Sequence, residues 1–473
     1  MKKFLKGVLI TVIALLLIVI AYALYYAPAV MTGMAAKTMC SCVFVMNRTP
    51  ESVLEKEFRV FPGLDLTDPQ INRDDFSVTT RILWKQGKAI YREGLGCTLL
   101  AERPEREVRN QAIETPNLNF PANIDSVAWP MGDRIDSTSL KGIDYDALHR
   151  AIDQAFADID PENPVNTHGV VVLYDGQLIG EKYAPGFDHR SRLMGWSMTK
   201  SITNALMGIM VKEGYFKVDD PAPIAEWQND ERKNITINHL LQASAGLEWK
   251  EGYFDPASDF HTMFIRSDDK ARFAASREQE SKPGSVFEYS SGTTNIISRI
   301  IREKIGDANY YKYPYEMLFQ KIGMYRAIIE PDASGTFVAS SYGYASARDW
   351  ARFGLLYLND GVWNGERILP EGWVKYSTTP APAAPMREYG AQIWLNRGAA
   401  NDPSKCKYPG LPNDAFVFDG FEENSVVVIP SRRVVVARLG VTHNSNFNHA
   451  ALIQQILAAV PASPHPALSS TRR

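Results

Sequence analysis

The stretch Gly195–Ile202 reads GWSMTKSI and places Ser197 three residues before Lys200. Apolar residues continue behind it at helical spacing, and Gly214 stands where a glycine commonly ends a helix. On a helix, residues three apart share one face, with about 5–6 Å between their Cβ atoms. A lysine amine at that distance can take the proton of a serine hydroxyl if burial or a neighbour keeps the amine neutral. The stretch therefore predicts a nucleophilic serine at the start of a buried helix.

Strand patterns lie on both sides of this helix in the chain. Two β-rich runs, 169–174 and 177–180, are joined by Asp175-Gly176, a strong hairpin signal. Three more strands are expected at 416–418, 425–429 and 434–439, with a helix at 450–460. The region between the two sets reads mainly as helices. We therefore expect an α+β fold: an antiparallel sheet built from both ends of the catalytic domain, with helices on its faces and a mainly helical insertion.

Spacing alone is weak support for the site, because Ser-x-x-Lys occurs three times in this chain. Ser267, before Lys270, is followed by two aspartates and is interpreted as the N-cap of a solvated helix. Ser404, before Lys407, lies in a loop rich in proline and lysine. Only Ser197 heads an apolar helix, and its alternative is a capping serine with the lysine on the surface.

A second element lies at Tyr289-Ser290-Ser291, directly before another helix with apolar spacing. A buried phenol can share a proton with a nearby lysine amine, so Tyr289 and Lys200 can act as base toward Ser197 and then as acid toward a leaving group. The alternative is a tyrosine packed in the core with its hydroxyl bound to backbone. The chain has 21 tyrosines, so this motif needs support from other parts of the sequence.

That support comes from a resemblance. Ser197-x-x-Lys200, Tyr289-x-Ser291 and the late strand pair resemble the three motifs of the serine β-lactamase and penicillin-binding-protein superfamily. The similarity is strongest to the class C β-lactamase-like serine hydrolases, which include 6-aminohexanoate-dimer hydrolases and esterases. It covers roughly residues 165–460 and includes three further segments: 235–247, 347–354 and 389–394.

The resemblance implies a β-lactamase/transpeptidase-like fold and a role for each motif residue. Ser197 is expected to be the acylated nucleophile, with Lys200 and Tyr289 as the proton-transfer pair. Ser291 takes the position of the second-motif polar residue, which is usually Asn in class C β-lactamases. We therefore expect a serine hydrolase that cleaves a small-molecule amide or ester. The alternatives are a β-lactamase, a DD-peptidase-like penicillin-binding protein, and a non-catalytic membrane-anchored sensor.

The third motif departs from the family pattern. Gly420 matches the motif glycine, but Phe418–Glu423 contains neither the lysine nor the histidine that holds a substrate carboxylate in relatives. Acidic residues gather there instead, which favours a positively charged substrate: Asp419, Glu422 and Glu423. By resemblance, the N–H of Phe421 joins that of Ser197 in an oxyanion hole. The alternative is that Asp419-Gly420 only forms a turn.

A Ser-His arrangement is the alternative to the serine–lysine pair. Gly195-Trp196-Ser197 is similar to the start of an α/β-hydrolase elbow, in which His443 or His449 would be the base, but that motif needs glycine where Thr199 stands. The sequence contains no His-Glu-x-x-His motif and no glycine-rich phosphate loop. No cofactor and no metal are expected.

The N-terminus is predicted to anchor the protein in a membrane. Three lysines precede an apolar run at 8–26 that ends in a tyrosine pair, which predicts a cytoplasmic tail at 1–7 and a single transmembrane helix. A cleaved signal peptide is the alternative. The expected location is the bacterial inner membrane, with the catalytic domain on the periplasmic side. A net charge of −3 without a basic run argues against nucleic-acid binding.

The remaining chain is divided into three parts. A small N-terminal region at 30–125 is expected to hold a β-hairpin, with strands 76–83 and 89–100 around a turn at 85–88, and to end in a linker at 115–124. The serine hydrolase domain is placed at 126–460 and a disordered tail at 461–473. Four cysteines allow disulfides outside the cytoplasm, with the Cys40–Cys42 pairing the least expected; a metal site and free thiols are alternatives for Cys40, Cys42, Cys97 and Cys406.

Overall fold

The computed structural model describes residues 2–114, 121, 123–135, 140–158, 160, 162–443 and 446–462. Most of the predicted linker at 115–124 and nearly all of the predicted tail at 461–473 lie outside these residues.

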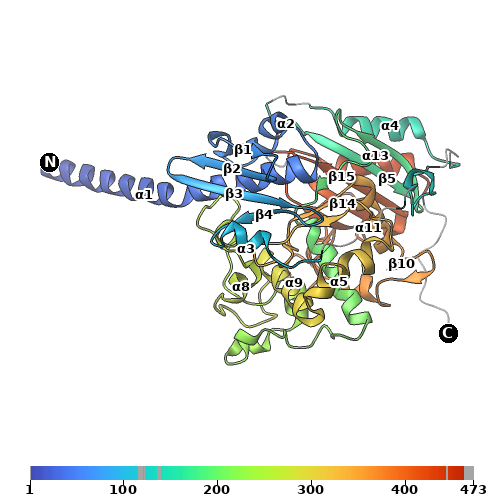
Figure 1. The fold of residues 1–473 in the computed structure, drawn as a ribbon. Helices are drawn as coiled ribbons and strands as arrows, with labels where there is room; N and C mark the ends of the chain where they lie inside the picture. The colour runs from blue at the N-terminus through green and yellow to red at the C-terminus, as the bar shows by residue number, and fades with distance from the viewer. Residues whose placement is uncertain are drawn as a thin grey trace.

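A six-stranded antiparallel sheet forms the centre of the molecule (Figure 1). In order across the sheet the strands are β12 (Trp394–Leu395), β13 (Phe416–Gly420), β14 (Asn424–Ile429), β15 (Val434–Gly440), β5 (Thr167–Tyr174) and β6 (Gln177–Tyr183). The predicted α+β fold with one antiparallel sheet built from both ends of the domain is confirmed. The Asp175-Gly176 hairpin is confirmed as well, because β5 and β6 pair directly across it.

Helices cover both faces of this sheet, because apolar side chains of β5 point alternately to one face and to the other. Val170 and Val172 pack in one apolar cluster with α4 (Tyr145–Gln154) and α13 (His449–Ala459). Val171 and Leu173 face the opposite side and join the main core with α5 (Met198–Lys212) and α11 (Ala347–Leu358). Successive side chains of a strand point to opposite faces, so a strand buried on both sides is apolar throughout.

The main helical block contains α5 and α9 (Ser291–Ile305); α9 begins directly after Tyr289-Ser290, as predicted, and Ser290 caps it. The prediction for Ser267 was wrong: Asp269 caps α8 (Lys270–Ala275), and Lys270 is buried.

The other helices are α2 (Pro50–Glu55), α3 (Glu105–Arg109), α6 (Ile237–Leu241), α7 (Asp259–His261), α10 (Asp307–Tyr310) and α12 (Trp373–Ser377). Short 3-10 and π turns are η1 (Ser41–Val45), η2 (Glu57–Arg59), η3 (Leu64–Leu66), η4 (Ile124–Ser126), η5 (Ala225–Trp227), η6 (Glu231–Asn234), η7 (Thr262–Arg266), η8 (Tyr315–Phe319) and η9 (Pro430–Arg432). Small sheets use β7 (Leu193–Met194), β8 (Ile328–Ile329), β9 (Gly343–Ala345), β10 (Val362–Trp363) and β11 (Glu366–Arg367).

The N-terminal region forms a four-stranded sheet rather than a hairpin alone: β1 (Gln70–Asn72), β2 (Ser77–Ile82), β3 (Lys85–Arg92) and β4 (Gly96–Leu100). The turn predicted at 85–88 was misplaced, since β2 and β3 meet across Leu83-Trp84. Gly87 lies inside a strand because helix α1 (Lys2–Cys40) approaches it so closely that a Cβ would come within 2.4 Å of the Thr32 carbonyl oxygen.

A disulfide joins Cys40 at the end of α1 to Cys97 in β4, which settles one of the open pairings; Cys42 and Cys406 are free. Glu330 of the catalytic domain forms a buried ion pair with Lys37 of α1 and accepts a hydrogen bond from the Cys97 N–H at 2.6 Å. The N-terminal region is therefore bonded to the catalytic domain through side chains of the protein interior.

Helix α1 is continuous from Lys2 to Cys40, so residue 26 is not a structural boundary. Its first part projects from the body (Figure 1), and the large apolar side chains described between Phe4 and Ile18 are exposed. One helix among the described residues is long and apolar enough to cross a membrane, with a candidate span at Leu24–Val45 that is 78% buried in the protein. Signal sequences and buried core helices share these properties.

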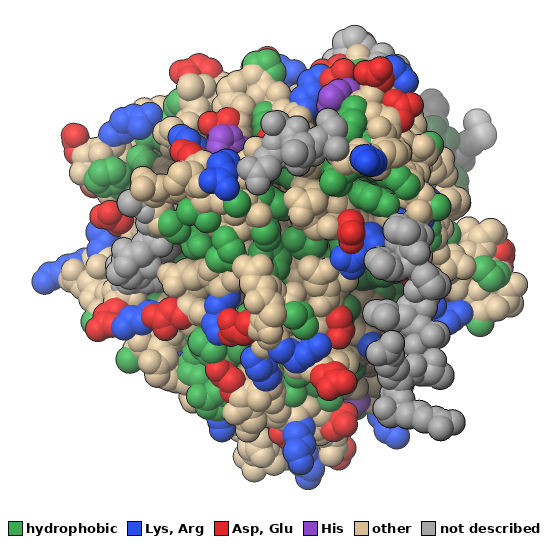
Figure 2. Space-filling view, turned by 90° about the vertical axis from the view of Figure 1, so that its right-hand side faces the viewer, with side chains coloured by type: hydrophobic (Ala, Val, Ile, Leu, Met, Phe, Trp, Pro, Cys, Tyr) green, Lys and Arg blue, Asp and Glu red, His purple; other side chains and the backbone are tan. Residues whose placement is uncertain are grey.

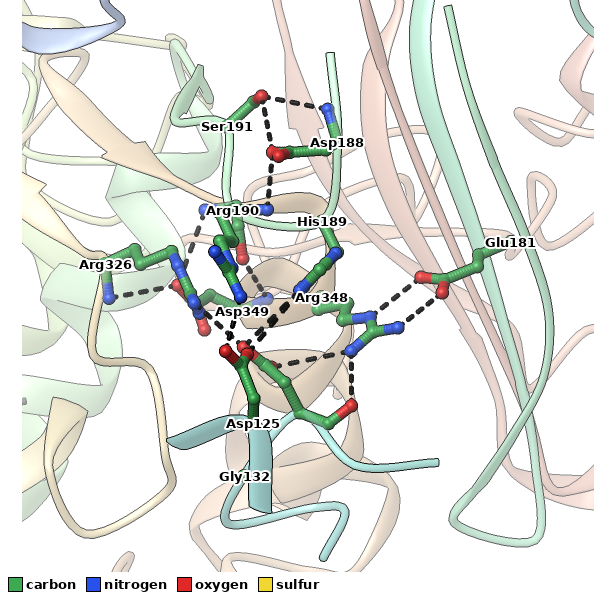
Figure 3. Close-up of polar contacts among 12 residues, drawn as sticks. Asp125, Gly132, Glu181, Asp188, His189, Arg190, Ser191, Arg326, Arg348 and Asp349 are labelled. Atoms are coloured by element: carbon green, nitrogen blue, oxygen red, sulfur yellow. Dashed lines mark hydrogen bonds and ion pairs between the residues drawn. The ribbon is translucent and has the colours of Figure 1, made fainter. Parts of the chain in front are cut away.

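A buried ion cluster ties residues 123–135 to α11 (Figure 3). Asp133 pairs with Arg326 at 2.8 Å and with Arg352 at 2.9 Å, and it lies 3.6 Å from Arg348. Burial opposes the charge of Asp133, but the arginines outweigh it and hold the pKa of this carboxyl below its usual value. The family segment 347–354 therefore supplies arginines that hold the fold together.

On the side of the molecule turned away from α1, basic and acidic side chains are interspersed around a band of hydrophobic ones (Figure 2). This mixed charge on the visible face agrees with the net charge of −3.

Candidate active site

Ser197 stands in a strained turn between β7 and α5. Trp196 before it has a φ of +48°, a left-handed value that a bulky side chain rarely adopts. Gly195 permits this turn, because a Cβ there would lie 2.2 Å from the Trp350 ring. Ser197 makes no capping hydrogen bond with its side chain. The alternative of a capping serine is therefore wrong for this residue.

Lys200 lies one turn into α5 and is only 2% exposed, so it is not a surface lysine. Its ammonium donates hydrogen bonds to Ser197 Oγ at 3.0 Å, to Ser291 Oγ at 3.1 Å and to the Ser340 carbonyl at 3.0 Å. Burial lowers the pKa of Lys200 to about 8, although the negative charge of Glu251 opposes the shift. At that pKa, a useful fraction of the amine is neutral near neutral pH, as a general base requires.

Glu251 is the residue that sequence reasoning missed. Its carboxylate accepts hydrogen bonds from the Ser291 N–H at 2.9 Å, from Ser291 Oγ at 2.5 Å and from Trp249 Nε1 at 2.6 Å. It thereby fixes the Ser291 hydroxyl, which in turn accepts from Lys200. Glu251 lies in a loop without any recognisable motif, and its only sequence signal is its position four residues after the 235–247 segment.

Tyr289 reaches the same point from the start of α9. The Lys200 amine lies 4.9 Å from the centre of its ring, and the tyrosine is hydrogen-bonded to Ser197. Burial, followed by the nearby Tyr253, raises the pKa of Tyr289 well above its usual value. The phenol is therefore protonated at neutral pH, which suits a proton donor better than a base.

The end of β13 lies against the nucleophile turn. A Cβ on Gly420 would come 2.3 Å from the Gly195 carbonyl oxygen, so only glycine allows this approach. The Phe421 ring packs edge-on against Trp196 at 5.7 Å. The structure therefore brings together all six residues that the sequence singled out: Ser197, Lys200, Tyr289, Ser291, Gly420 and Phe421.

An open pocket of about 1060 Å³ lies over Ser197. Its lining includes the end of β13 and the side chains of Tyr289, Trp394, Glu251, Tyr253 and Phe254. The N-terminal region supplies part of the rim through Glu55, Lys56, Arg59, Val60 and Pro62. The pocket is therefore shared between the two regions of the chain.

Asp419, Glu422 and Glu423 line this pocket, and part of their charge is offset within the protein, which weakens the argument for a cationic substrate. Asp419 pairs with Lys407 at 3.1 Å. Glu423 lies 3.1 Å from His449 Nε2, but burial lowers the pKa of this imidazole below its usual value, so His449 supplies little positive charge near pH 7. Burial raises the pKa of Glu422 to about 8, so this carboxyl is largely neutral near pH 7. Lys407 is a cation beside the third motif; it comes from the loop between β12 and β13 and belongs to one of the three Ser-x-x-Lys matches.

The two histidines of the rival arrangement lie elsewhere. His443 lines the pocket rim, and burial lowers its pKa. His449 is buried at the start of α13, where its Nδ1 lies 3.2 Å from Ser425 Oγ. The groups that bond to the Ser197 hydroxyl are instead Lys200 and Tyr289.

One group of donor atoms could be considered for a metal. Among the described residues, Asp125, Asp133 and His189 bring three ligand atoms within 4.8 Å of one another. Asp133 is already surrounded by Arg326, Arg348 and Arg352, so positive charge is supplied there by the protein itself. This donor set does not fit a cation.

A serine bonded to a buried lysine on an antiparallel α+β scaffold is the arrangement found in penicillin-recognising serine enzymes. A model of the protein family described as Beta-lactamase matches residues 152–460, more than half of the chain. The chain belongs to this beta-lactamase family.

Known relatives carry hydrolase names. The chain is 26% identical over 224 residues to a 6-aminohexanoate-dimer hydrolase of Paenarthrobacter ureafaciens, covering 44% of this chain and 56% of that protein. It thus spans little more than half the length of this curated relative. A solved structure described as a 6-aminohexanoate-dimer hydrolase from Bacillus anthracis superposes with a TM-score of 0.52 at 25% identity, covering 62% of this chain and 78% of that one. A family VIII carboxylesterase shares the fold, with a TM-score of 0.50 at 14% identity, covering 69% and 98%.

Proposed function

We propose that this protein is a serine hydrolase that cleaves an amide or ester bond through an acyl-enzyme on Ser197. The observation that carries the proposal is the 3.0 Å contact between Ser197 Oγ and the amine of Lys200, a lysine that is almost completely buried. The names of the relatives, which are hydrolases of a 6-aminohexanoate dimer and of carboxylic esters, support the same class of reaction.

In the acylation step, neutral Lys200 takes the proton of Ser197 while Oγ attacks the substrate carbonyl carbon. Charge then develops on the carbonyl oxygen, toward which the N–H groups of Ser197 and Phe421 point in our proposal. The bond to the leaving alkoxide or amine breaks, and Tyr289 gives it a proton. The proton held by Lys200 restores the phenol, so the step ends with an acyl-serine and a free alcohol or amine.

In the deacylation step, water attacks the acyl carbonyl and gives its proton to neutral Lys200. The ester bond to Ser197 breaks, and the serine regains a proton through Lys200 and Tyr289. A carboxylic acid is released, and the proposed reaction uses no cofactor. Ser291 and Glu251 are assigned to positioning the lysine, because Glu251 holds the Ser291 hydroxyl against the Lys200 amine.

For the substrate, we propose a small amide or ester rather than a penicillin. Ser291 stands where class C β-lactamases usually carry Asn, and Lys407 is held by Asp419 at 3.1 Å, which offsets its attraction for a substrate carboxylate. A β-lactamase, a DD-peptidase and a non-catalytic sensor remain the competing assignments that the test below addresses.

We further propose that the N-terminal part of α1 anchors the protein, with the catalytic domain on the periplasmic side of the bacterial inner membrane. The exposed apolar side chains from Phe4 to Ile18 support this location. A disulfide between Cys40 and Cys97 is also typical of a compartment outside the cytoplasm.

The test is a substrate panel: p-nitrophenyl acetate, an acyl p-nitroanilide and a chromogenic cephalosporin. We expect turnover of the ester and the anilide, and its loss in Lys200→Ala. Lys212→Ala, on the exposed end of the same helix, is the control. Faster turnover of the cephalosporin would replace the proposal with a β-lactamase. No turnover of any compound, with Lys200→Ala indistinguishable from the parent protein, would favour the sensor.

A further inference from the structure

A continuous series of aromatic side chains leads from the nucleophile to helix α1. Phe421, which packs on Trp196, stacks on Phe61 of the N-terminal region with ring centres 5.2 Å apart. The ring centre of Phe61 lies 6.4 Å from that of Phe254, which lines the pocket and is 68% exposed. Next to Phe254, Asp255 accepts a hydrogen bond from the Tyr22 hydroxyl of α1 at 3.4 Å. The pocket mouth therefore lies beside the projecting helix.

The β2–β3 hairpin reaches the same level of α1. Its paired residues Thr80 and Gly87 contact the Thr32 backbone, and the hairpin points in the same direction as the free end of α1 (Figure 1). Its tip is three residues further on, or about 10 Å at the rise of a β-strand. Along a helix, about 10 Å corresponds to roughly seven residues. The tip thus lies level with Tyr25.

Apolar side chains at this level are exposed around the helix. Leu83 and Trp84 at the hairpin tip are each 65% exposed, as is Tyr25. We call the following set the collar: Tyr22, Tyr25, Leu83, Trp84 and Phe254. Beyond the collar, toward the N-terminus, the described apolar side chains of α1 are exposed from Phe4 to Ile18. Tyrosine and tryptophan are the side chains that prefer the boundary between lipid headgroups and hydrocarbon.

From this arrangement we infer that the collar rests on the surface of a lipid bilayer and that the pocket opens there. The substrate is accordingly an amphiphilic ester or amide whose apolar part stays in the bilayer while its carbonyl reaches Ser197 past Phe254. This inference rests on the proposed function and adds the substrate class and the place where it is met. A bilayer fits the collar because the exposed apolar segment of α1 continues directly from it.

The test uses the full-length protein in vesicles of phosphatidylcholine and phosphatidylglycerol. Two p-nitrophenyl esters are compared, the water-soluble acetate and a long-chain ester held in the vesicles. In Leu83→Ser/Trp84→Ser we expect kcat/KM to fall about tenfold for the long-chain ester, because apolar contact with the bilayer is lost. Hydrolysis of the acetate stays within about twofold, since neither side chain lines the pocket. Tyr215→Ser changes an exposed aromatic residue just after the C-terminal end of α5 and should alter neither rate.

A second measurement does not depend on the double variant folding. Lipids brominated near the headgroup should quench tryptophan emission of the parent protein more than that of Trp84→Phe. Equal quenching of the two proteins, or an unchanged long-chain rate in the double variant, would overturn the inference while leaving the proposed function intact. Failure of the parent protein to hydrolyse the acetate would instead overturn the proposed function.

Discussion

The carboxylate of Glu251 holds Ser291 at two points, accepting from its N–H at 2.9 Å and from its hydroxyl at 2.5 Å. Ser291 in turn accepts a hydrogen bond from Lys200, so Glu251 sets the position and the charge balance of the amine that bonds to Ser197. A residue outside all three motifs is thereby linked to the proposed base through Ser291.

The pH dependence of hydrolysis should report Lys200. A base must be neutral, so kcat/KM is expected to rise with pH and to level off above the Lys200 pKa of about 8. Glu251→Gln removes the negative charge that raises this pKa, and the rising limb should therefore move to lower pH. Glu248→Gln, which alters an exposed acid paired with Arg277, serves as the control and should keep the parent profile. If the rising limb of the pH profile lies at the same pH in Glu251→Gln as in the parent protein, Glu251 does not affect the pKa of Lys200.

Tyr289→Phe should distinguish the proposed role of Tyr289, as proton donor to the leaving group, from that of Lys200 as base. Removing the phenolic proton donor is expected to lower kcat by about 10²–10⁴-fold for an alkyl ester or an amide, whose leaving groups need a proton. A p-nitrophenyl ester should lose much less, because p-nitrophenolate leaves without one. Tyr389→Phe changes a hydroxyl on the ring that packs against Tyr289, at 5.9 Å between centres, and should affect both substrates little. Equal losses for the two leaving groups would point to a packing role for Tyr289.

Loss of the Cys40–Cys97 disulfide should destabilise the whole protein. The bond closes a loop with a sequence separation of 57 residues, so Cys97→Ser is expected to lower the free energy of unfolding by about 4 kcal/mol. Urea unfolding measures the change, and Cys406→Ser, at a free cysteine, should stay within about 0.5 kcal/mol of the parent. If Cys97→Ser unfolds at the same urea concentration as the parent, the N-terminal region contributes no cross-link to stability.

Much of the central sheet and of the site could be predicted, because local patterns encode them. The Asp175-Gly176 turn, the apolar late strands and the helix after Tyr289-Ser290 are each defined by residues only a few positions apart. Lys200 and Ser197 were found for the same reason: one helical turn brings them together.

The features that the sequence did not predict depend on contacts between segments that are separated along the chain. Gly87 resembles a turn residue, yet it lies in a strand, where the lack of a Cβ lets α1 pack on it. Lys407 is close to Asp419 only because a long loop returns to the end of β13, and Glu251 reaches Ser291 across 40 residues of chain. No spacing rule on one strand or helix contains such information.

The central claim, that Ser197 is the acylated nucleophile, is tested most directly by intact mass after treatment with a fluorophosphonate. We expect one adduct per chain, mapped to the peptide that holds Ser197, and no adduct in Ser197→Ala. Ser404→Ala, at another Ser-x-x-Lys match, should label like the parent protein. An adduct that persists in Ser197→Ala, or that maps to another residue, would contradict the account.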